Sequence, residues 1–173
     1  MKKLNNAWKG RYAQLIAELV RHGNIASRAN LRKINYPSFG FSLASPEWQI
    51  LEYIVERPDD SNMATISNYL GIVPSTMTKY TKTLMQLGLI EKYHTESNKK
   101  NIILKPSSLG LRFYEEKNAG TLPSMFDGIH TYLEDLSDNQ LKAVCKAIHS
   151  LDDQITEVSN KNEIMKKLIR IHK

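Results

Sequence analysis

The sequence predicts a mainly α-helical fold with a small β-wing, and three observations support this prediction. Apolar residues recur at helical spacing through long stretches at both ends of the chain. Two shorter helical patterns, in residues 62–87, are joined by the turn sequence Leu70-Gly71-Ile72-Val73-Pro74. Two short strand-like runs then flank a polar, basic tip. A chain of 173 residues is long enough for one domain with a good core, or for a small domain plus an assembly element.

Positive charge is concentrated in two parts of the chain. The net charge is +6, and composition is that of a globular protein, with 41% hydrophobic and 24% charged residues. Residues 1–36 carry eight Lys and Arg against only Glu18. Residues 63–106 carry six Lys against Glu91 and Glu96. This distribution favours a polyanionic partner.

The chain shows no sign of secretion or of membrane insertion. Its start, Met1-Lys2-Lys3-Leu4, is followed by polar and charged residues that interrupt any apolar run, so no signal peptide is expected. No run of about 18 apolar residues occurs, so no membrane span is expected. The single Cys145 excludes an intramolecular disulfide and fits a reducing cytoplasm, where we expect the protein to act. Cys145 itself is predicted to be a buried packing residue.

Residues 4–29 are predicted to form one long amphipathic helix, because their apolar residues are spaced by three, four and seven positions. This stripe consists of Leu4, Trp8, Tyr12, Leu15, Leu19 and Ala26. Four basic residues lie off it: Lys9, Arg11, Arg21 and Arg28. They either form the solvated back of a packed helix or lean toward the phosphates of a nucleic acid, and the sequence leaves both interpretations open.

A loop and a second helix are expected next. Residues 34–44 hold Pro37 and Gly40 among aromatic residues and are predicted to form the loop. Ser45 is a good N-cap, a proline suits the first helical position, and the early Glu47 complements the helix dipole. The buried face of this helix is expected to consist of Trp48, Leu51, Ile54 and Val55.

The two following helical patterns are predicted to form a helix-turn-helix unit. Asn62 can cap the first helix, whose core face is expected to be Ile66, Tyr69 and Leu70. Gly71 supplies the left-handed backbone of a tight turn, and Pro74 starts the second helix. The inward face of residues 74–87 is Met77, Thr81, Leu84 and Leu87, and the outward face is Ser75, Thr76, Thr78, Lys79, Lys82, Thr83 and Gln86. Small hydroxyls, an amide and lysines can donate to phosphates and base edges.

A β-hairpin is predicted to follow this unit as a wing. Its strands are expected in residues 89–93 and 102–104, and the polar residues 94–101 between them are expected to form its tip. The paired Lys99 and Lys100 make this tip basic. A basic helix beside a basic wing predicts binding to double-stranded DNA. The alternative, a winged unit whose basic face binds a protein partner, stays open.

Residues 43–110 resemble the winged helix-turn-helix core of the MarR family of bacterial transcription regulators. The matching features are Leu43, Trp48-x-x-Leu51, Ile66, Leu70-Gly71, the run from Ser75 to Lys79, Leu84-x-x-x-Gly88-Leu89-Ile90-Glu91-Lys92 and Ser107-x-x-Gly110. The wing departs from the family pattern, which usually has an Asp followed by Arg where this chain has Asn98, Lys99 and Lys100. The resemblance implies three parts: an N-terminal dimerisation helix in 1–36, the DNA-binding domain in 43–110, and C-terminal dimerisation helices in 111–173.

A seam of apolar residues in the C-terminal part predicts a homodimer. Ser137 and Gln140 have the spacing of a capping box, which starts the helix. The apolar residues then follow spacings of three and four: Leu141, Val144, Ile148, Leu151, Ile155 and Val158. Such a seam suits a partner helix, although the core of a monomer is the alternative. The basic residues 161–173 either extend this helix or fray.

These observations predict a homodimer that regulates transcription from a pseudo-palindromic operator. Ser75, Thr76, Thr78 and Lys79 are expected at base edges or nearby phosphates, and Lys82, Lys99 and Lys100 at phosphates, with Asn98 shaping the wing tip. Half-site centres are expected about 34–36 Å apart. The family resemblance implies repression by occupancy, relieved by a small-molecule or stress signal that the sequence does not identify.

No catalytic chemistry is predicted for this chain. There is no P-loop or other Gly-rich phosphate loop, and Cys145 has no local Cys/His motif. The five histidines do not have the spacing of metal ligands. We therefore expect no enzymatic activity, no cofactor and no metal site.

Overall fold

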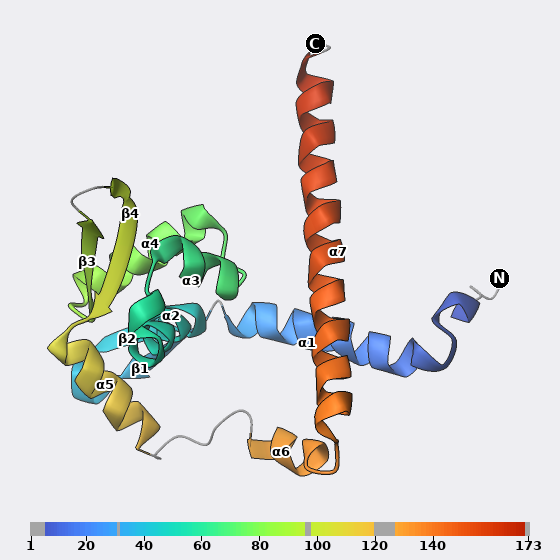
Figure 1. The fold of residues 1–173 in the computed structure, drawn as a ribbon, viewed down its shortest axis with the longest axis horizontal. Coiled ribbons are helices and arrows are strands. Elements are labelled where there is room, and N and C mark those ends of the chain that lie inside the picture. Colours follow the sequence, from blue (N-terminus) through green and yellow to red (C-terminus); the bar gives the residue numbers. More distant parts are fainter. Residues whose placement is uncertain (1–5, 31, 96–97, 120–126, 172–173) are drawn as a thin grey trace. The chain divides into compact units, whose positions relative to one another are not determined.

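The computed structural model of this chain describes the backbone of residues 6–30, 32–95, 98–119 and 127–171. Within these ranges it describes all side chains except those of 6–8, 95, 98–100, 127, 128, 130 and 158–171. The described chain is mainly helical with a small β-wing, as predicted, and it contains a second two-stranded antiparallel sheet that was not predicted (Figure 1). It divides into two compact units, Met1–Leu122 and Pro123–Lys173.

The N-terminal part is not one continuous helix. A 3-10 helix, η1 (Asn6–Tyr12), precedes the helix α1 (Ala13–Ala29). Gly10, with φ 49° and ψ −137°, kinks the chain inside η1, in a backbone conformation that glycine adopts without a steric cost. The prediction of a single helix over residues 4–29 is therefore wrong at its start. None of the described α1 side chains is buried, and Leu15 and Val20 are 59% and 60% exposed.

Residues 33–44 form a β-hairpin, so the predicted loop is wrong. Strand β1 (Lys33–Tyr36) pairs antiparallel with β2 (Phe41–Ala44), and Tyr36 lies opposite Phe41. The intervening 3-10 helix η2 (Pro37–Phe39) ends at Gly40, whose φ of 73° closes the connection. Proline and glycine thus mark only the turn, while the aromatic and β-branched residues beside them pair as strands.

The helix α2 (Ser45–Glu56) starts one residue earlier than predicted, because its N-cap is Ala44 rather than Ser45. Alanine has no side-chain acceptor, and the cap is instead completed from the third helical position. The buried Glu47 carboxylate accepts a hydrogen bond from the Ala44 amide at 2.8 Å, and the Lys33 ammonium lies 4.0 Å from it. The core face of α2 consists of Ile50, Leu51 and Ile54, with Trp48 and Val55 only half-buried.

The helix α5 (Ser108–Asn118) closes this core with one aromatic ring. Ser107, a residue type that is favoured at N-caps, caps α5 by accepting a hydrogen bond from the Gly110 amide at 3.0 Å. Phe113, which is 1% exposed, contacts four aromatic rings edge-on. Its ring centroid lies 4.8–5.5 Å from those of Tyr36, Phe39, Phe41 and Trp48. The β1–β2 hairpin is therefore joined to α2 and α5 through this ring.

A half-buried lysine also joins α2 to α5. The Lys117 ammonium lies 3.5 Å from the centre of the Trp48 ring, and Tyr114 stacks on the same ring at 5.8 Å. Burial lowers the pKa of Lys117 from 10.5 to about 8, while the nearby Glu52 opposes this shift. The pKa of Glu52 is in turn raised, chiefly by burial. Desolvation thus weakens the preference of Lys117 for its charged form.

We predict that replacing Lys117 flattens the pH dependence of stability. Its folded pKa lies below its unfolded pKa, so the unfolded state binds more protons between pH 8 and 10.5. The contribution of Lys117 to the free energy of unfolding therefore rises with pH in this window. In urea titrations from pH 7 to 9.5, the free energy of unfolding should rise less with pH for Lys117→Met than for the wild type. Lys142→Met, which replaces an exposed lysine, should show the same rise as the wild type. Equal slopes in all three proteins would contradict the prediction.

The second unit contains the helices α6 (Asp127–Leu133) and α7 (Asp138–Ile171). The predicted capping box is confirmed: the Ser137 amide donates to the Gln140 side-chain oxygen at 2.9 Å, and the Gln140 amide donates to the Ser137 hydroxyl at 3.4 Å. Residues 161–171 extend α7. Cys145 is exposed in the single chain, so its predicted burial is wrong there. Gly120 and Pro123 predict a kink or a break near residues 120–124, and these lie outside the described residues.

Within the part of the chain that the structure describes, no helix is long and apolar enough to cross a membrane.

Candidate nucleic-acid interface

The helix-turn-helix unit has the geometry predicted for it. In α3 (Met63–Tyr69) the Asn62 side chain caps the helix, accepting from the amides of Ala64 and Thr65 at 2.8 and 3.3 Å. Gly71, with φ 63°, then reverses the chain, and the Ile72 amide donates to the Ser67 carbonyl at 2.9 Å. The helix α4 (Pro74–Gln86) starts at its proline. A backbone bond therefore holds the turn between the two helices.

One predicted core residue of α3 lies at the surface. Ile66 is fully buried, but Tyr69 is 61% exposed. The Arg57 guanidinium lies 4.9 Å from the ring centres of both Tyr53 and Tyr69, and it donates to the Tyr69 hydroxyl at 3.3 Å. Stacking on a charged group near the surface thus takes the place of burial.

The inward face of α4 fixes the helix to the domain. Met77 and Leu84 are fully buried, and Thr81 is 3% exposed, while Leu87 beyond the helix end is half-buried. The Thr81 hydroxyl donates to the Met77 carbonyl at 2.9 Å, so its polar group is satisfied within the helix. Because these side chains anchor one side of α4, the opposite side is held outward in a fixed orientation.

The predicted DNA-contacting residues of α4 lie together on that outward side. Ser75, Thr78, Lys79 and Lys82 are exposed, and Thr76 is half-buried. Their spacing of three, four and seven residues places the exposed ones along one stripe of the helix. The stripe combines two cations with small hydroxyl side chains, and no acidic residue occurs anywhere in α4.

The chain leaves α4 through Gly88 and enters the wing. Gly88, with φ 69°, and Leu89 donate backbone hydrogen bonds to Met85 and Leu84 at 3.0 and 2.9 Å, the pattern of a Schellman motif. Strand β3 (Ile90–Thr95) pairs antiparallel with β4 (Asn98–Pro106). Most of the predicted tip, residues 94–101, is therefore strand rather than loop. The side chains of the predicted contacts Asn98, Lys99 and Lys100 lie outside the described residues.

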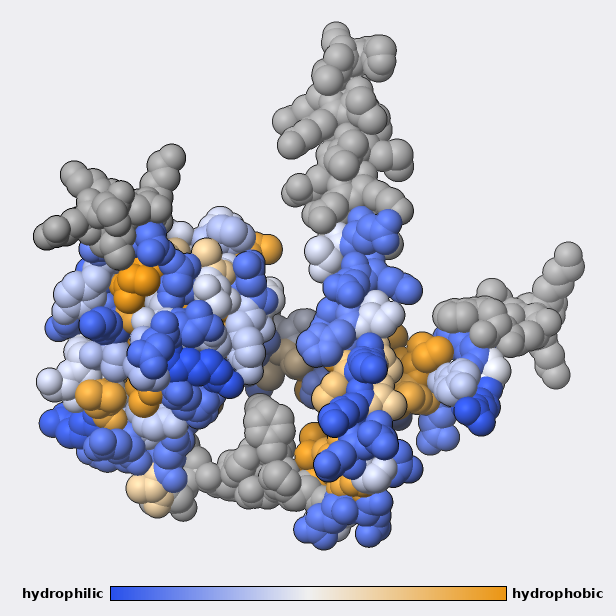
Figure 2. Space-filling model, in the orientation of Figure 1, coloured by the Kyte–Doolittle hydropathy of each residue, from blue (hydrophilic) through white to orange (hydrophobic). Residues whose placement is uncertain are grey.

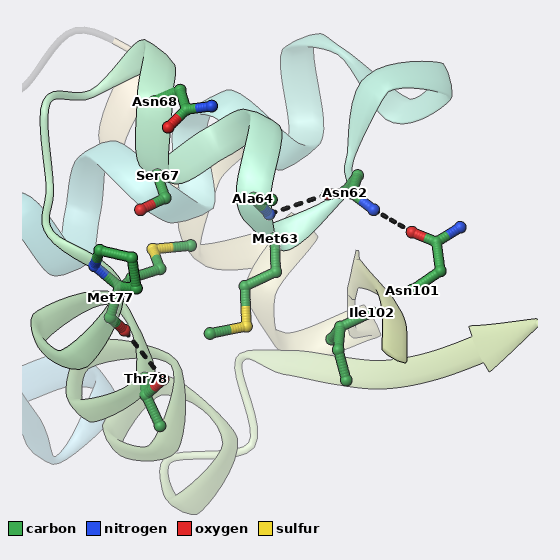
Figure 3. Close-up of a pocket in the computed structure, with 10 residues that line it drawn as sticks. Asn62, Met63, Ala64, Ser67, Asn68, Met77, Thr78, Asn101 and Ile102 are labelled. Atoms are coloured by element: carbon green, nitrogen blue, oxygen red, sulfur yellow. Dashed lines mark hydrogen bonds between the residues drawn. The ribbon is translucent and has the colours of Figure 1, made fainter. Parts of the chain in front are cut away.

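The wing is joined to the start of α3. The Leu104 amide donates to the Ser61 carbonyl at 2.9 Å, and Asn62 forms a β-bridge with Ile103. The Asn62 side-chain amide also donates to the Asn101 side-chain oxygen (Figure 3). These contacts fix the wing relative to α3. Sequence reasoning assigned Asn62 only its capping role. Its second partner, Asn101, lies 39 residues further along the chain, and a contact at that separation leaves no local pattern in the sequence.

A cavity of about 440 Å³ lies between α3, α4 and β4. Apolar side chains form much of its wall, among them Met63, Met77 and Ile102, and Thr78 lies at its edge (Figure 3).

Two further cations of the wing, Lys92 and Lys105, are exposed, and Lys105 lies 5.7 Å from the centre of the Tyr93 ring. Sequence analysis assigned neither lysine a DNA-contacting role, although each lies in or directly beside a run that was predicted to form a wing strand.

The described residues bring no three His, Cys, Asp or Glu side chains together in a way that could hold a metal ion.

A helix-turn-helix unit followed directly by a two-stranded wing defines a winged helix-turn-helix domain, a class that presents its second helix to the DNA major groove. Residues 43–102 match the model of the MarR family, and this domain is a MarR-family domain. The predicted resemblance is confirmed. MarR-family proteins are DNA-binding transcription regulators and are not enzymes.

Solved structures of similar fold span most of the chain. They include a MarR protein from Peptoclostridium difficile (21% identity, 90% of this chain and 91% of that one, TM-score 0.52). MepR of S. aureus, crystallised with DNA, is 16% identical over 83% of this chain and 97% of its own, with a TM-score of 0.54. A MarR/EmrR family regulator from Acinetobacter sp. ADP1 is 15% identical over 86% of this chain and 98% of its own, with a TM-score of 0.55. At these identities the similarity concerns the fold. No curated protein sequence matches the chain.

Proposed function

We propose that this protein is a transcriptional repressor that binds a pseudo-palindromic operator as a homodimer. The observation that carries the proposal is the outward stripe of α4, where Ser75, Thr78, Lys79 and Lys82 are exposed on a helix anchored by its buried face. A helix presented in this way can enter the major groove. Repression follows from occupancy, because a protein bound to the operator excludes other proteins from it.

In this proposal the contacts divide between bases and phosphates. Ser75, Thr76, Thr78 and Lys79 lie toward the start of α4 and meet base edges or the nearest phosphates. Lys82, one turn further along, contacts a phosphate. Lys99 and Lys100 at the wing attract the flanking backbone, and Asn98 shapes the tip. A lysine carries charge without the planar fork of an arginine, so the wing acts as an anchor rather than a reader of bases.

A dimer is supported by apolar side chains that the single chain leaves uncovered. On α7, Val144, Ile148, Leu151 and Ile155 are 40–57% exposed, and Leu141 is half-buried. Figure 2 shows that hydrophobic patches lie among the hydrophilic residues on the surface of the described chain. The sixth residue of the predicted seam, Val158, has a side chain outside the described residues. Apolar side chains repeated along one helix face favour association with a partner helix. A two-fold dimer would present two winged domains to a two-fold DNA site.

A small-molecule or stress signal is proposed to release the operator. Such a signal acts if it binds better to one spacing of the two winged domains than to the other. The support for this step is the match of residues 43–102 to the model of the MarR family.

The salt dependence of DNA binding tests the proposal. Each lysine that neutralises a phosphate releases counterions, so log K should fall linearly with log salt for the wild type. Lys79→Ala with Lys82→Ala, and separately Lys99→Ala with Lys100→Ala, should make this slope shallower by about one per lysine. Lys142→Ala with Lys146→Ala, which removes two exposed lysines of α7 off the seam, is the matched control and should keep the slope.

The operator itself is obtained by selecting bound fragments from random DNA. A selected site with two-fold symmetry and half-sites about one helical turn apart supports the dimer. An asymmetric site contradicts it. Binding that does not weaken between low and high salt would instead favour the alternative, in which the basic face of the winged domain binds a protein partner.

A further inference from the structure

The hydroxyl groups on the outward side of α4 differ in what they can donate. The Thr78 hydroxyl donates to the Pro74 carbonyl at 2.9 Å, and the Thr83 hydroxyl donates to the Lys79 carbonyl at 3.3 Å. Among the described residues, the hydroxyls of Ser75 and Thr76 make no hydrogen bond. A hydroxyl has one proton, so a threonine that donates it to the helix backbone has none left for another acceptor.

This restricts what Thr78 can contact in a DNA groove. Phosphate oxygens, guanine N7 and O6, and thymine O4 are acceptors, and each requires a donor from the protein. Because the Thr78 hydroxyl donates its proton to the Pro74 carbonyl, Thr78 has no hydrogen-bond donor left for these acceptor atoms. What it retains is a γ-methyl group, together with an oxygen that can only accept. The base edge that a methyl group suits is the C5-methyl of thymine.

The surroundings of Thr78 agree with an apolar contact. Its side chain is exposed at the edge of the cavity whose wall includes Pro74, Met77 and Ile102. Figure 3 shows the Thr78 hydroxyl turned back along α4 in its hydrogen bond. The exposed Pro74, one turn earlier on the same helix, has no N–H and is also unable to donate. This part of the α4 stripe therefore presents carbon atoms rather than donors.

We propose that Thr78 is a specificity-determining residue that reads a thymine through its γ-methyl group, while the donors of Ser75 and Thr76 are left for acceptors. This inference rests on the proposed DNA-binding function and adds which base the helix selects at one position. Thr78 was predicted at a base edge or a nearby phosphate. Because its hydroxyl donates to the Pro74 carbonyl and a phosphate oxygen requires a donor, we infer that Thr78 contacts the base.

Deoxyuridine, which is thymidine without the C5-methyl, is the probe. A half-site selected by the wild-type protein is rebuilt with each thymine replaced in turn by uracil, and binding is measured at fixed salt. At one position the replacement should weaken binding about fourfold per half-site, the effect of removing one buried methyl group. Replacements elsewhere in the half-site should have smaller effects.

Two variants assign this preference to Thr78. Thr78→Val keeps a methyl group at that position without the hydroxyl, and it should retain the preference for thymine over uracil. Thr78→Ser keeps the hydroxyl without the methyl, and it should bind the thymine and uracil sites alike. The readout is the ratio of the two affinities for each protein. Because Thr78 is exposed, neither change disturbs the buried face of α4.

The outcomes separate this inference from the function on which it rests. Salt-dependent, site-selective binding with no thymine in the half-site, or with the uracil effect unchanged in Thr78→Ser, overturns the role of Thr78 and leaves the regulator intact. Loss of the preference in Thr78→Val, with retention in Thr78→Ser, shows that the hydroxyl reads the base and also overturns it. Binding that ignores both salt and sequence defeats the proposed function itself.

Discussion

Phe113→Ala should lower the free energy of unfolding of the winged unit by about 3–5 kcal/mol. The ring is 1% exposed and lies against four other aromatic rings, which come from the β1–β2 hairpin and from α2. Truncation removes the apolar transfer energy of the ring and leaves a cavity that rigid neighbours fill only in part. The aromatic pairs also lose their edge-on contacts.

Urea denaturation followed by circular dichroism measures this effect. Leu111→Ala is the matched control, because it introduces the same residue into the same helix, two positions away. Its side chain is 40% exposed, so its loss should cost clearly less than that of Phe113. Similar losses in the two variants would show that the aromatic cluster does not hold α5 to the domain.

The parts of the fold that could be predicted are those whose ends are marked in the sequence. Helix α4 was expected over residues 74–87 and is observed at Pro74–Gln86. Its proline fits the start, and Gly88 takes the positive φ that ends a helix. The caps at Asn62 and Ser137 were predicted for the same reason, because each depends on residues within three positions.

The parts that could not be predicted depend on contacts distant in sequence or on weak local signals. A proline and a glycine near aromatic residues fit a loop and a short hairpin equally well, and only the pairing of Lys33–Tyr36 with Phe41–Ala44 distinguishes them. Tyr69 fits the spacing of a buried face, yet Arg57, twelve residues earlier, holds it at the surface. The spacing of apolar residues in α3 gives no indication of a partner that lies outside this helix.

The candidate site shows the same division. Periodicity identified the outward residues of α4, because the buried positions of Met77, Thr81 and Leu84 determine the opposite side. It could not tell whether the Thr78 hydroxyl faces the groove or its own helix, since both are compatible with the same spacing. The hydrogen bond to the Pro74 carbonyl distinguishes them and changes the chemistry expected at that position.

Gly110→Ala should also destabilise the winged unit strongly, by about 3 kcal/mol or more, at or beyond the upper end of the range for overpacking. A Cβ added to Gly110 would lie 2.1 Å from the Leu89 carbonyl oxygen and 3.1 Å from its carbon. The obstacle is backbone, so no side-chain rotation relieves it. The Leu89 oxygen also accepts the Ser107 amide at 3.0 Å, and moving it away would disturb the hydrogen bond at the start of α5.

Gly23→Ala is the comparison that separates this clash from the general effect of the substitution. Gly23 lies inside α1 with no atom within 4 Å of an added Cβ, so the change should stabilise the helix by about 0.5–1 kcal/mol. Urea midpoints should therefore move in opposite directions for the two variants. If Gly110→Ala instead matched the wild type, α5 would be free to shift away from Leu89. Close packing against Leu89 would then not explain the spacing Ser107-x-x-Gly110. The hydrogen bond by which Ser107 caps α5 would be its only explanation.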